Sequence, residues 1–237
     1  FPFDPSNYKQ VAQQLPAPET ALNLRHSRWR VAAAAGGVRG RLAARLVRVN
    51  GSLATLDLHG CRIGDEGAKA LAAGVAASGS LAILCLGSNQ IGDEGAKALA
   101  AGAAASGSLV SIGLGNNQIG DEGAKALAMA VCFSGSLAHL NLHSCGIGDE
   151  GAKALAASVA ASSSLAELIL WGRRIGDESA TALAEAIRTS GSMAKLFLND
   201  NDVTAAAKQS LRDAVQGRQN FQLRFYASVA HRWPRVA

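Results

Sequence analysis

The most regular feature of the chain is a pattern of hydrophobic residues that recurs every 28 positions. Each unit opens with Leu-x-x-Leu-x-Leu, as at Leu53, Leu56 and Leu58. Because Leu56 and Leu58 alternate with polar residues, they predict a short strand with one buried face. Six units follow one another without a break and cover residues 52–79, 80–107, 108–135, 136–163, 164–191 and 192–219.

The second half of each unit has the pattern of a helix. Asp65 and Glu66 stand at its start, where acidic residues suit the helix dipole and an Asp side chain can cap the free amides. Lys69 follows at a spacing that lets it pair with both carboxylates on the solvent side. The apolar positions recur at helical spacing and predict a buried face made of Ala68, Leu71, Ala72 and Val75.

A single strand and helix cannot bury their apolar faces alone, so the units must stack into one continuous core. Neighbouring strands lie about 4.8 Å apart, whereas packed helices need about 8–10 Å. The helix side of the stack is therefore wider than the strand side. The sequence predicts a curved α/β solenoid with a parallel sheet inside and helices outside.

This pattern resembles the ribonuclease-inhibitor-like leucine-rich repeats, which are also found in nucleotide-binding innate-immune receptors. The resemblance covers residues 52–219 and implies a leucine-rich-repeat solenoid of about six repeats with caps. An Asn or Cys of the family is expected to bond backbone groups in each turn, and Arg173 departs from this, so the fifth turn should be irregular. The corresponding positions here are Cys61, Asn89, Asn117, Cys145, Arg173 and Asn201.

The two ends of the chain differ from the repeats. Residues 40–50 match the helix of a preceding, incomplete unit, whereas residues 1–38 match no repeat and are proline-rich at the start. Phe221, Leu223 and Phe225 alternate and predict a last edge strand. We therefore expect a non-repeat extension at 1–38, a solenoid with its N-terminal cap helix at 39–219, and an edge strand with a basic tail at 220–237.

The net charge of +5 is unevenly distributed along the chain. Residues 1–50 carry eight basic and two acidic residues, and the acidic middle is followed by a second basic end. A basic end can contact an acidic protein, nucleic acid or anionic lipid. Because no nucleic-acid-binding motif is present, we favour an assembly contact. This basic contact region comprises Arg25, Arg28, Trp29, Arg30, Arg39, Arg41, Arg45 and Arg48.

The cysteines and the absence of targeting signals bear on the compartment. Two of the four cysteines fill the turn position, so we expect free thiols rather than a disulfide framework. No transmembrane stretch or signal peptide is visible in the sequence. We expect a reducing intracellular compartment: the cytoplasm, or an organelle if a leader was removed before Phe1. The cysteines are Cys61, Cys85, Cys132 and Cys145.

The motifs that suggest chemistry are incomplete. The segment at 113–118 begins like a dinucleotide-binding loop but lacks its third glycine, and Gly-Asp-Glu-Gly-Ala-Lys lacks the Lys-Ser/Thr ending of a phosphate loop. His139 and His143 lie about 13 Å apart on an extended strand, which is too far to share one zinc. We therefore predict no enzyme activity, no cofactor and no metal site.

The variable positions of the strands indicate where a partner binds. Units four to six place large side chains there, and aromatic residues often dominate the energy of interfaces. In the family that the chain resembles, partners lie on this concave side. The alternative is that Trp171 and Phe197 only cover each other. The candidate partner-binding residues are His139, Asn141, His143, Glu167, Ile169, Trp171, Lys195 and Phe197.

Taken together, these features predict a non-enzymatic protein-binding scaffold or an accessory subunit associated with a larger complex, with an unidentified protein as partner. One alternative is a recognition or regulatory module of a larger nucleotide-binding receptor. Another is nucleic-acid binding through the basic ends, which a salt-dependent affinity for generic RNA or DNA would reveal.

Overall fold

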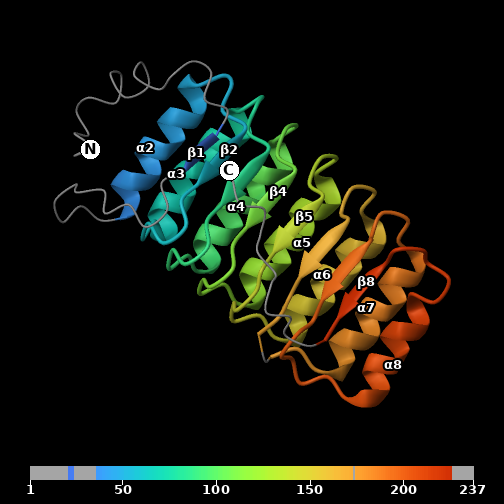
Figure 1. The fold of residues 1–237 in the computed structure, drawn as a ribbon. Helices are drawn as coiled ribbons and strands as arrows, with labels where there is room; N and C mark the ends of the chain where they lie inside the picture. The colour runs from blue at the N-terminus through green and yellow to red at the C-terminus, as the bar shows by residue number, and fades with distance from the viewer. Residues whose placement is uncertain (1–20, 24–35, 173, 226–237) are drawn as a thin grey trace.

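Short strands and helices alternate along the part of the chain that the structure describes (Figure 1). The structure is a computed structural model, and it describes residues 21–23, 36–172 and 174–225. The strands are β1 (Ala21–Asn23), β2 (Thr55–Asp57), β3 (Ile83–Cys85), β4 (Ser111–Gly113), β5 (His139–Asn141), β6 (Glu167–Ile169), β7 (Lys195–Phe197) and β8 (Gln222–Arg224). The helices are α2 (Gly36–Val49), α3 (Gly64–Ala77), α4 (Asp93–Ala105), α5 (Asp121–Phe133), α6 (Asp149–Ala161), α7 (Asp177–Thr189) and α8 (Ala205–Ala214). Each of the six predicted units contributes one strand and one helix.

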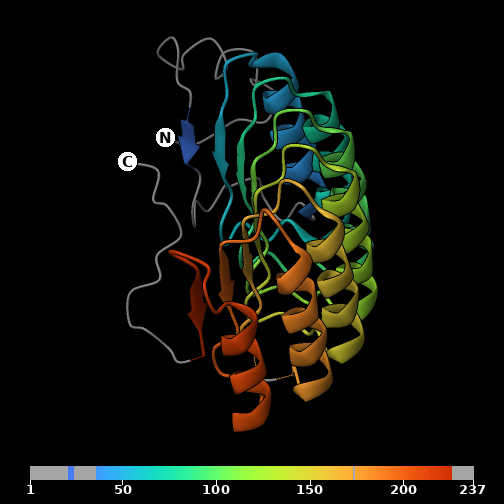
Figure 2. The ribbon, with the colours of Figure 1, turned by 90° about the vertical axis from the view of Figure 1, so that its right-hand side faces the viewer.

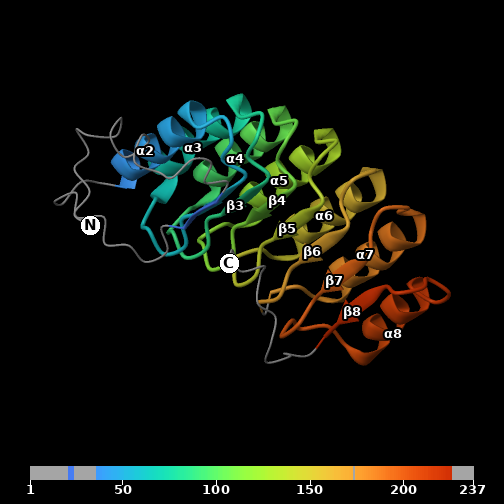
Figure 3. The ribbon, with the colours of Figure 1, turned by 45° about the horizontal axis from the view of Figure 1, so that its top comes forward.

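The strands form one parallel sheet in chain order, from β1 to β8. Consecutive repeats pair in register, so that Thr55 pairs with Ile83, and Ile83 pairs with Ser111. Figures 2 and 3 show the helices along the outer side of a curve and the strands along its inner side. The predicted α/β solenoid is confirmed. None of the described helices is long and apolar enough to cross a lipid bilayer.

The core lies between the sheet and the helices and is built from the leucine positions of every repeat. Leu56, Leu58 and Leu71 are fully buried. Small residues let neighbouring helices approach closely. A Cβ on Gly102 would lie 2.6 Å from the backbone oxygen of Ala72, so this close contact between α3 and α4 requires glycine.

Where the turn position is Asn or Cys, its side chain holds the turn after the strand, as expected. The Asn117 amide accepts hydrogen bonds from the backbone N–H groups of Asn89 (2.9 Å) and Ile91 (3.0 Å) and donates to the carbonyl oxygen of Leu86 (2.9 Å). The Cys145 thiol donates to the carbonyl oxygen of Leu114 (3.4 Å). The side chains thus satisfy backbone groups that would otherwise be buried without partners.

The fifth turn differs from the others, as the sequence predicted. Gly172 has a φ of 152°, whereas the equivalent Ser144 and Asp200 have φ values of 51° and 54°. A residue other than glycine rarely adopts the Gly172 conformation. Arg173 itself lies outside the described residues.

In the first five of the six repeats, an aspartate caps the helix of the next repeat rather than its own. The Asp93 carboxylate accepts hydrogen bonds from the backbone N–H groups of Gly120 (2.7 Å) and Gly123 (2.9 Å), at the start of α5. A carboxylate at this position satisfies free amides and suits the positive end of the helix dipole. The expectation that Asp caps its own helix is therefore wrong, because the N-cap residue of α4 is Gly92 and Asp93 is already the first helical residue.

The glutamate beside each of these aspartates makes the expected surface ion pair. Glu94 and Lys97 are 2.9 Å apart, and Glu122 and Lys125 are also 2.9 Å apart. In the first repeat Lys69 pairs with Glu66 at 3.0 Å, while Asp65 bonds to the next repeat. The predicted pairing of the lysine is thus confirmed for the glutamate alone.

Both ends of the solenoid carry extra elements. The predicted cap helix is present as α2, and β8 is the predicted edge strand. The structure also places Ala21–Asn23 in the sheet, paired with β2. The predicted boundary at residue 38 falls within α2, and a strand paired with β2 precedes that helix. At the other end, the Thr204 hydroxyl accepts a hydrogen bond from the Ala207 N–H (3.4 Å) and caps α8.

Candidate protein-binding site on the concave face

The eight predicted partner-binding residues come together on three neighbouring strands and the positions just after them. His139 and Lys195 flank Glu167 in one row across β5, β6 and β7. Asn141, Ile169 and Phe197 form the next row in the same register. Because they alternate with the buried leucines, these side chains point to the inner side of the curve, away from the helices.

The first row is an ionic network centred on a buried carboxylate. The Glu167 carboxylate lies 3.3 Å from Nδ1 of His139 and 3.2 Å from Nζ of Lys195. The hydrogen bond from His139 and the contact with Lys195 lower the pKa of Glu167 to about 2, against the opposing effect of burial. Glu167 is thus ionised at neutral pH and holds its two half-buried neighbours in place.

A stacked pair of rings follows the strands. The rings of His143 and Trp171 lie 4.8 Å apart and are inclined by only 16°. With its proton on Nδ1, His143 donates to the Asn141 side chain (2.8 Å), and its Nε2 accepts from the Asn116 amide (2.8 Å). Burial, together with the charge of His59, lowers the pKa of His143 to about 4, so the imidazole is neutral at physiological pH.

The middle row is buried rather than presented to a partner. Ile169 is fully buried, and Phe197 and Asn141 are nearly so. The guanidinium of Arg224 lies over the Phe197 ring at 5.2 Å. The exposed surface of the site is therefore smaller than the eight candidate residues would make, because several of them are buried. The residues that keep exposed surface are His139, His143, Trp171 and Lys195.

The pairing of the aromatic residues also differs from the alternative that the sequence left open. Trp171 stacks on His143, and the ring of Phe197 is covered by Arg224. His143 in turn lies over Gly115, where a Cβ would come within 2.0 Å of the imidazole ring. Glycine on one strand thus makes room for a large ring on the next. Sequence reasoning missed Asn116 and Arg224, although Gly115 directly before Asn116 signals this close approach.

Comparison with known proteins agrees with this architecture. A family model described as Leucine Rich repeat matches residues 49–72, 80–100, 108–128 and 136–156. These matched segments of the chain are leucine-rich repeats.

Two solved structures are similar to this leucine-rich-repeat chain. One is described as leiomodin-1 actin-binding site 2, with 13% identity, a TM-score of 0.49, and coverage of 73% of this chain and 85% of that chain. The other is a tropomodulin C-terminal domain of Caenorhabditis elegans, with 13% identity, a TM-score of 0.49, and coverage of 75% of this chain and 91% of that chain. No curated protein sequence matches the chain.

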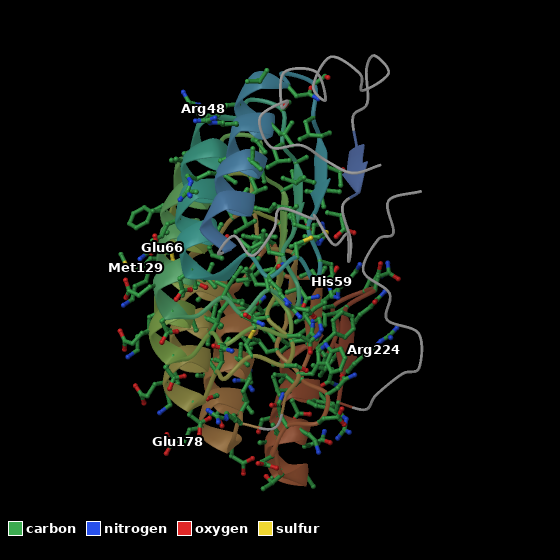
Figure 4. All side chains as sticks on the ribbon, turned by 90° about the vertical axis from the view of Figure 1, so that its left-hand side faces the viewer. Arg48, His59, Glu66, Met129, Glu178 and Arg224 are labelled. Carbon is green, nitrogen blue, oxygen red and sulfur yellow. The ribbon has the colours of Figure 1, made fainter. Side chains whose placement is uncertain are left out.

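The basic contact region lies apart from this concave site of the leucine-rich-repeat protein. Arg41, Arg45 and Arg48 are exposed on α2. Figure 4 shows Arg48 on the helix side of the molecule, whereas His59 and Arg224 lie on the strand side. The predicted contact residues Arg25, Arg28, Trp29 and Arg30, and the side chain of Arg39, lie outside the described part of the chain.

Metal-ligating side chains are dispersed over the described part of the chain. Within the described ranges, no three His, Cys, Asp or Glu side chains gather in a way that could hold a metal ion. The structure joins none of the four cysteines in a disulfide, and all but Cys132 are buried. Burial raises the pKa of the Cys145 thiol to about 11, so this residue is a poor nucleophile at neutral pH.

Proposed function

We propose that this leucine-rich-repeat protein is a non-enzymatic protein-binding scaffold, an accessory subunit of a larger complex, and that the concave surface over β5 to β7 holds a partner. The observation that carries this proposal is the contrast between a nearly constant framework and the large, variable side chains of this surface. Selectivity has to come from positions that vary, because the repeated framework is the same in every unit.

The accessible residues of this site are held in place by buried neighbours. Glu167 fixes His139 and Lys195, and Trp171 rests on the hydrogen-bonded His143 ring. Side chains that are already ordered lose little conformational entropy when a partner binds. Trp171 stacked on an imidazole, with Lys195 on the same face of the sheet, suits a partner segment that combines an aromatic or aliphatic side chain with a carboxylate for Lys195.

The test begins with affinity purification of partners on the full chain and their identification by mass spectrometry. The affinity of the purified partner is then measured for the wild-type protein and for Trp171→Ala. The loss of a central aromatic anchor typically costs about 2 kcal/mol or more, so we expect binding to weaken at least about tenfold. Thr55→Ala is the control, because Thr55 lies in the row of His139, Glu167 and Lys195 but on β2, away from β6 and Trp171.

The circular dichroism spectrum of Trp171→Ala should remain that of the wild type, which separates a binding defect from unfolding. Normal binding by Trp171→Ala, combined with loss of binding when Arg25, Arg28 and Arg30 are replaced by glutamate, would move the site to the basic end. Strongly salt-dependent binding to generic RNA would instead support the nucleic-acid alternative.

A further inference from the structure

The outer side of the solenoid carries an apolar surface that the concave site does not use. It occupies the C-terminal halves of four neighbouring helices, at three outward positions per helix. Nine of the twelve residues are alanine, and α5 alone has large side chains there: Met129 is 63% exposed and Phe133 is 73% exposed. We call this surface the outer apolar strip. It consists of Ala73, Ala76, Ala77, Ala101, Ala104, Ala105, Met129, Cys132, Phe133, Ala157, Ala160 and Ala161.

The fold does not require large apolar side chains at these positions. The core contacts of α5 are made by its other face, through residues such as Leu127 and Val131, which are buried. The N-terminal half of the same helix exposes the Glu122–Lys125 ion pair, as do the neighbouring helices with theirs. Contiguous apolar surface beside a polar margin marks a site of interaction with another molecule.

The strip ends where charged residues return at the same helical positions. On α2 these are the exposed Arg45 and Arg48, while the third equivalent position is the apolar Val49, which is 64% exposed. On α7 they are Glu185 and Arg188, which form an ion pair with each other. The strip is thus bordered by positive charge on the α2 side and by a neutral pair on the α7 side.

Most of the strip is a flat surface of alanine side chains, and one pair of larger side chains protrudes from it. Alanine side chains end at Cβ, whereas Met129 and Phe133 lie one helical turn apart and extend outward together. Figure 4 shows Met129 on the helix side, between the labelled Glu66 and Glu178 and away from His59. In protein interfaces, a few large anchor residues are typically surrounded by contacts that contribute little energy but exclude water. Met129 and Phe133, surrounded by alanines, have this arrangement.

We propose that the outer apolar strip docks a second protein, one whose surface offers an apolar pocket for Met129 and Phe133 and carboxylates facing Arg45 and Arg48. A second copy of this chain fits poorly, because it would meet one protruding pair with another on a convex surface. This site lies on the opposite side of the solenoid from the concave site. The protein would therefore join two different partners.

The exposed thiol in the middle of the strip allows a direct test. Cys132 is exposed, and the other three cysteines are buried, so a benzophenone maleimide should label Cys132 selectively on the native full-length protein. Irradiation of the labelled protein in a lysate of its source cells should give a discrete cross-linked adduct that mass spectrometry can identify. The captured protein is then purified and its affinity for the unlabelled chain is measured.

The decisive variant is Met129→Ala/Phe133→Ala. It gives α5 the same residues at these positions as α4 and α6, so it should keep the wild-type circular dichroism spectrum and melting temperature. We expect it to bind the captured protein at least about a hundredfold more weakly, since two anchors are lost. Val110→Ala, which truncates an exposed residue outside the strip, should change the affinity less than about twofold.

The charge requirement has its own pair of variants. Arg48→Glu should slow association several-fold, and the effect should shrink as salt is added. Arg62→Glu, the same charge change in an exposed turn, should leave the association rate nearly unchanged. Trp171→Ala should not affect this partner, so failure of the concave site and failure of the outer strip are distinguishable.

Several results would overturn the proposal. They are the absence of an adduct above the unirradiated control, an adduct that contains only a second copy of this chain, and unchanged binding by the double alanine variant. Binding of the wild-type protein, but not the variant, to vesicles of phosphatidylcholine and phosphatidylglycerol would also overturn it, because the strip would then be a membrane contact.

Discussion

Replacing Asp93 with alanine should destabilise the protein far more than changing its neighbour Glu94. The two carboxylates are adjacent in sequence but have different partners. Asp93 accepts hydrogen bonds from the Gly120 and Gly123 amides of the next repeat, at 2.7 and 2.9 Å. Glu94 reaches only the side chain of Lys97 across the exposed surface. The first contact links two repeats, whereas the second lies within one helix.

The size of the effect follows from the groups left without partners. Loss of an N-cap side chain costs about 0.5–2 kcal/mol, and a hydrogen bond to a charged group contributes about 1.5–3 kcal/mol. Because the two Asp93 bonds share one oxygen and solvent reaches part of the site, we expect Asp93→Ala to cost about 2 kcal/mol. Asp93→Asn keeps an acceptor oxygen but loses its charge, so it should cost about half as much.

The assay is urea denaturation followed by circular dichroism, with Glu94→Gln as the control. Asp93→Ala should lower the denaturation midpoint clearly, whereas the midpoint of Glu94→Gln should stay close to that of the wild type. Hydrogen exchange adds a local readout, because the amides of Gly120 and Gly123 should lose protection first. Equal midpoints for the two variants, or loss of protection at the start of α4 instead of α5, would refute capping between repeats.

Four further predictions concern other parts of the chain. Gly123→Ser should have a higher melting temperature than Gly123→Ala, although serine is larger. At the equivalent position Ser179 donates a hydrogen bond to Asp149, whereas an alanine methyl at position 123 would lie 2.7 Å from the Asp93 oxygen without bonding to it. A higher melting temperature for the alanine variant would contradict this. Stability should fall as the pH drops from about 6.5 to about 4, by at most about 3 kcal/mol, because only the unfolded chain protonates His143 in that window; above it both states are neutral, and His143→Gln should remove this part of the pH dependence. Arg173→Asn should raise the melting temperature by restoring the turn hydrogen bonds, and a clear decrease would show that Arg173 has a role of its own. Thiol titration in denaturant without reductant should find four thiols per chain, and a count of two or none would contradict the free cysteines.

The sequence predicts the repeat framework because its signals are local. Strand and helix follow from hydrophobic spacing within a single unit. Asn117 also donates to the Leu114 carbonyl of its own turn, whereas its bond to Leu86 crosses to the preceding repeat. The first strand escapes this reasoning. Leu22-Asn23-Leu24 matches Leu56-Asp57-Leu58, but its unit is incomplete, and the proline-rich sequence before it favours a loop.

Contacts between repeats are harder to predict because they depend on the spacing of the stacked units. The Asp93 carboxylate reaches Gly123, which is 30 residues later in the chain, and no local pattern distinguishes this from capping of its own helix. The glycine at position 123 nevertheless indicates this contact, since a Cβ there would lie 2.7 Å from the Asp93 oxygen. A glycine within the first turn of a helix, where it weakens helix formation, is the signal that reasoning from one unit overlooks.

The sequence predicts where the candidate site lies, but it does not predict which of its side chains are exposed. The strand period and the repeat length place His139, Glu167 and Lys195 side by side. They do not reveal that the middle row is buried or that Arg224 covers Phe197, because both depend on side-chain conformations and on the added strand β8. The burial of a variable position is decided by its neighbours on adjacent repeats, so the sequence of one strand is insufficient.

The two proposed interfaces follow from different constraints on the same repeat. Helix flanks must carry small residues where helices meet, as Gly102 shows against Ala72, but the outward positions of α5 face no such limit. Met129 and Phe133 therefore add nothing that the fold needs, and Trp171 stands on the other side of the core. Substitutions on either side should alter binding without altering stability. If the protein is a scaffold that joins two partners, Trp171→Ala should lose one partner and Phe133→Ala the other, while each variant retains the partner of the unchanged face.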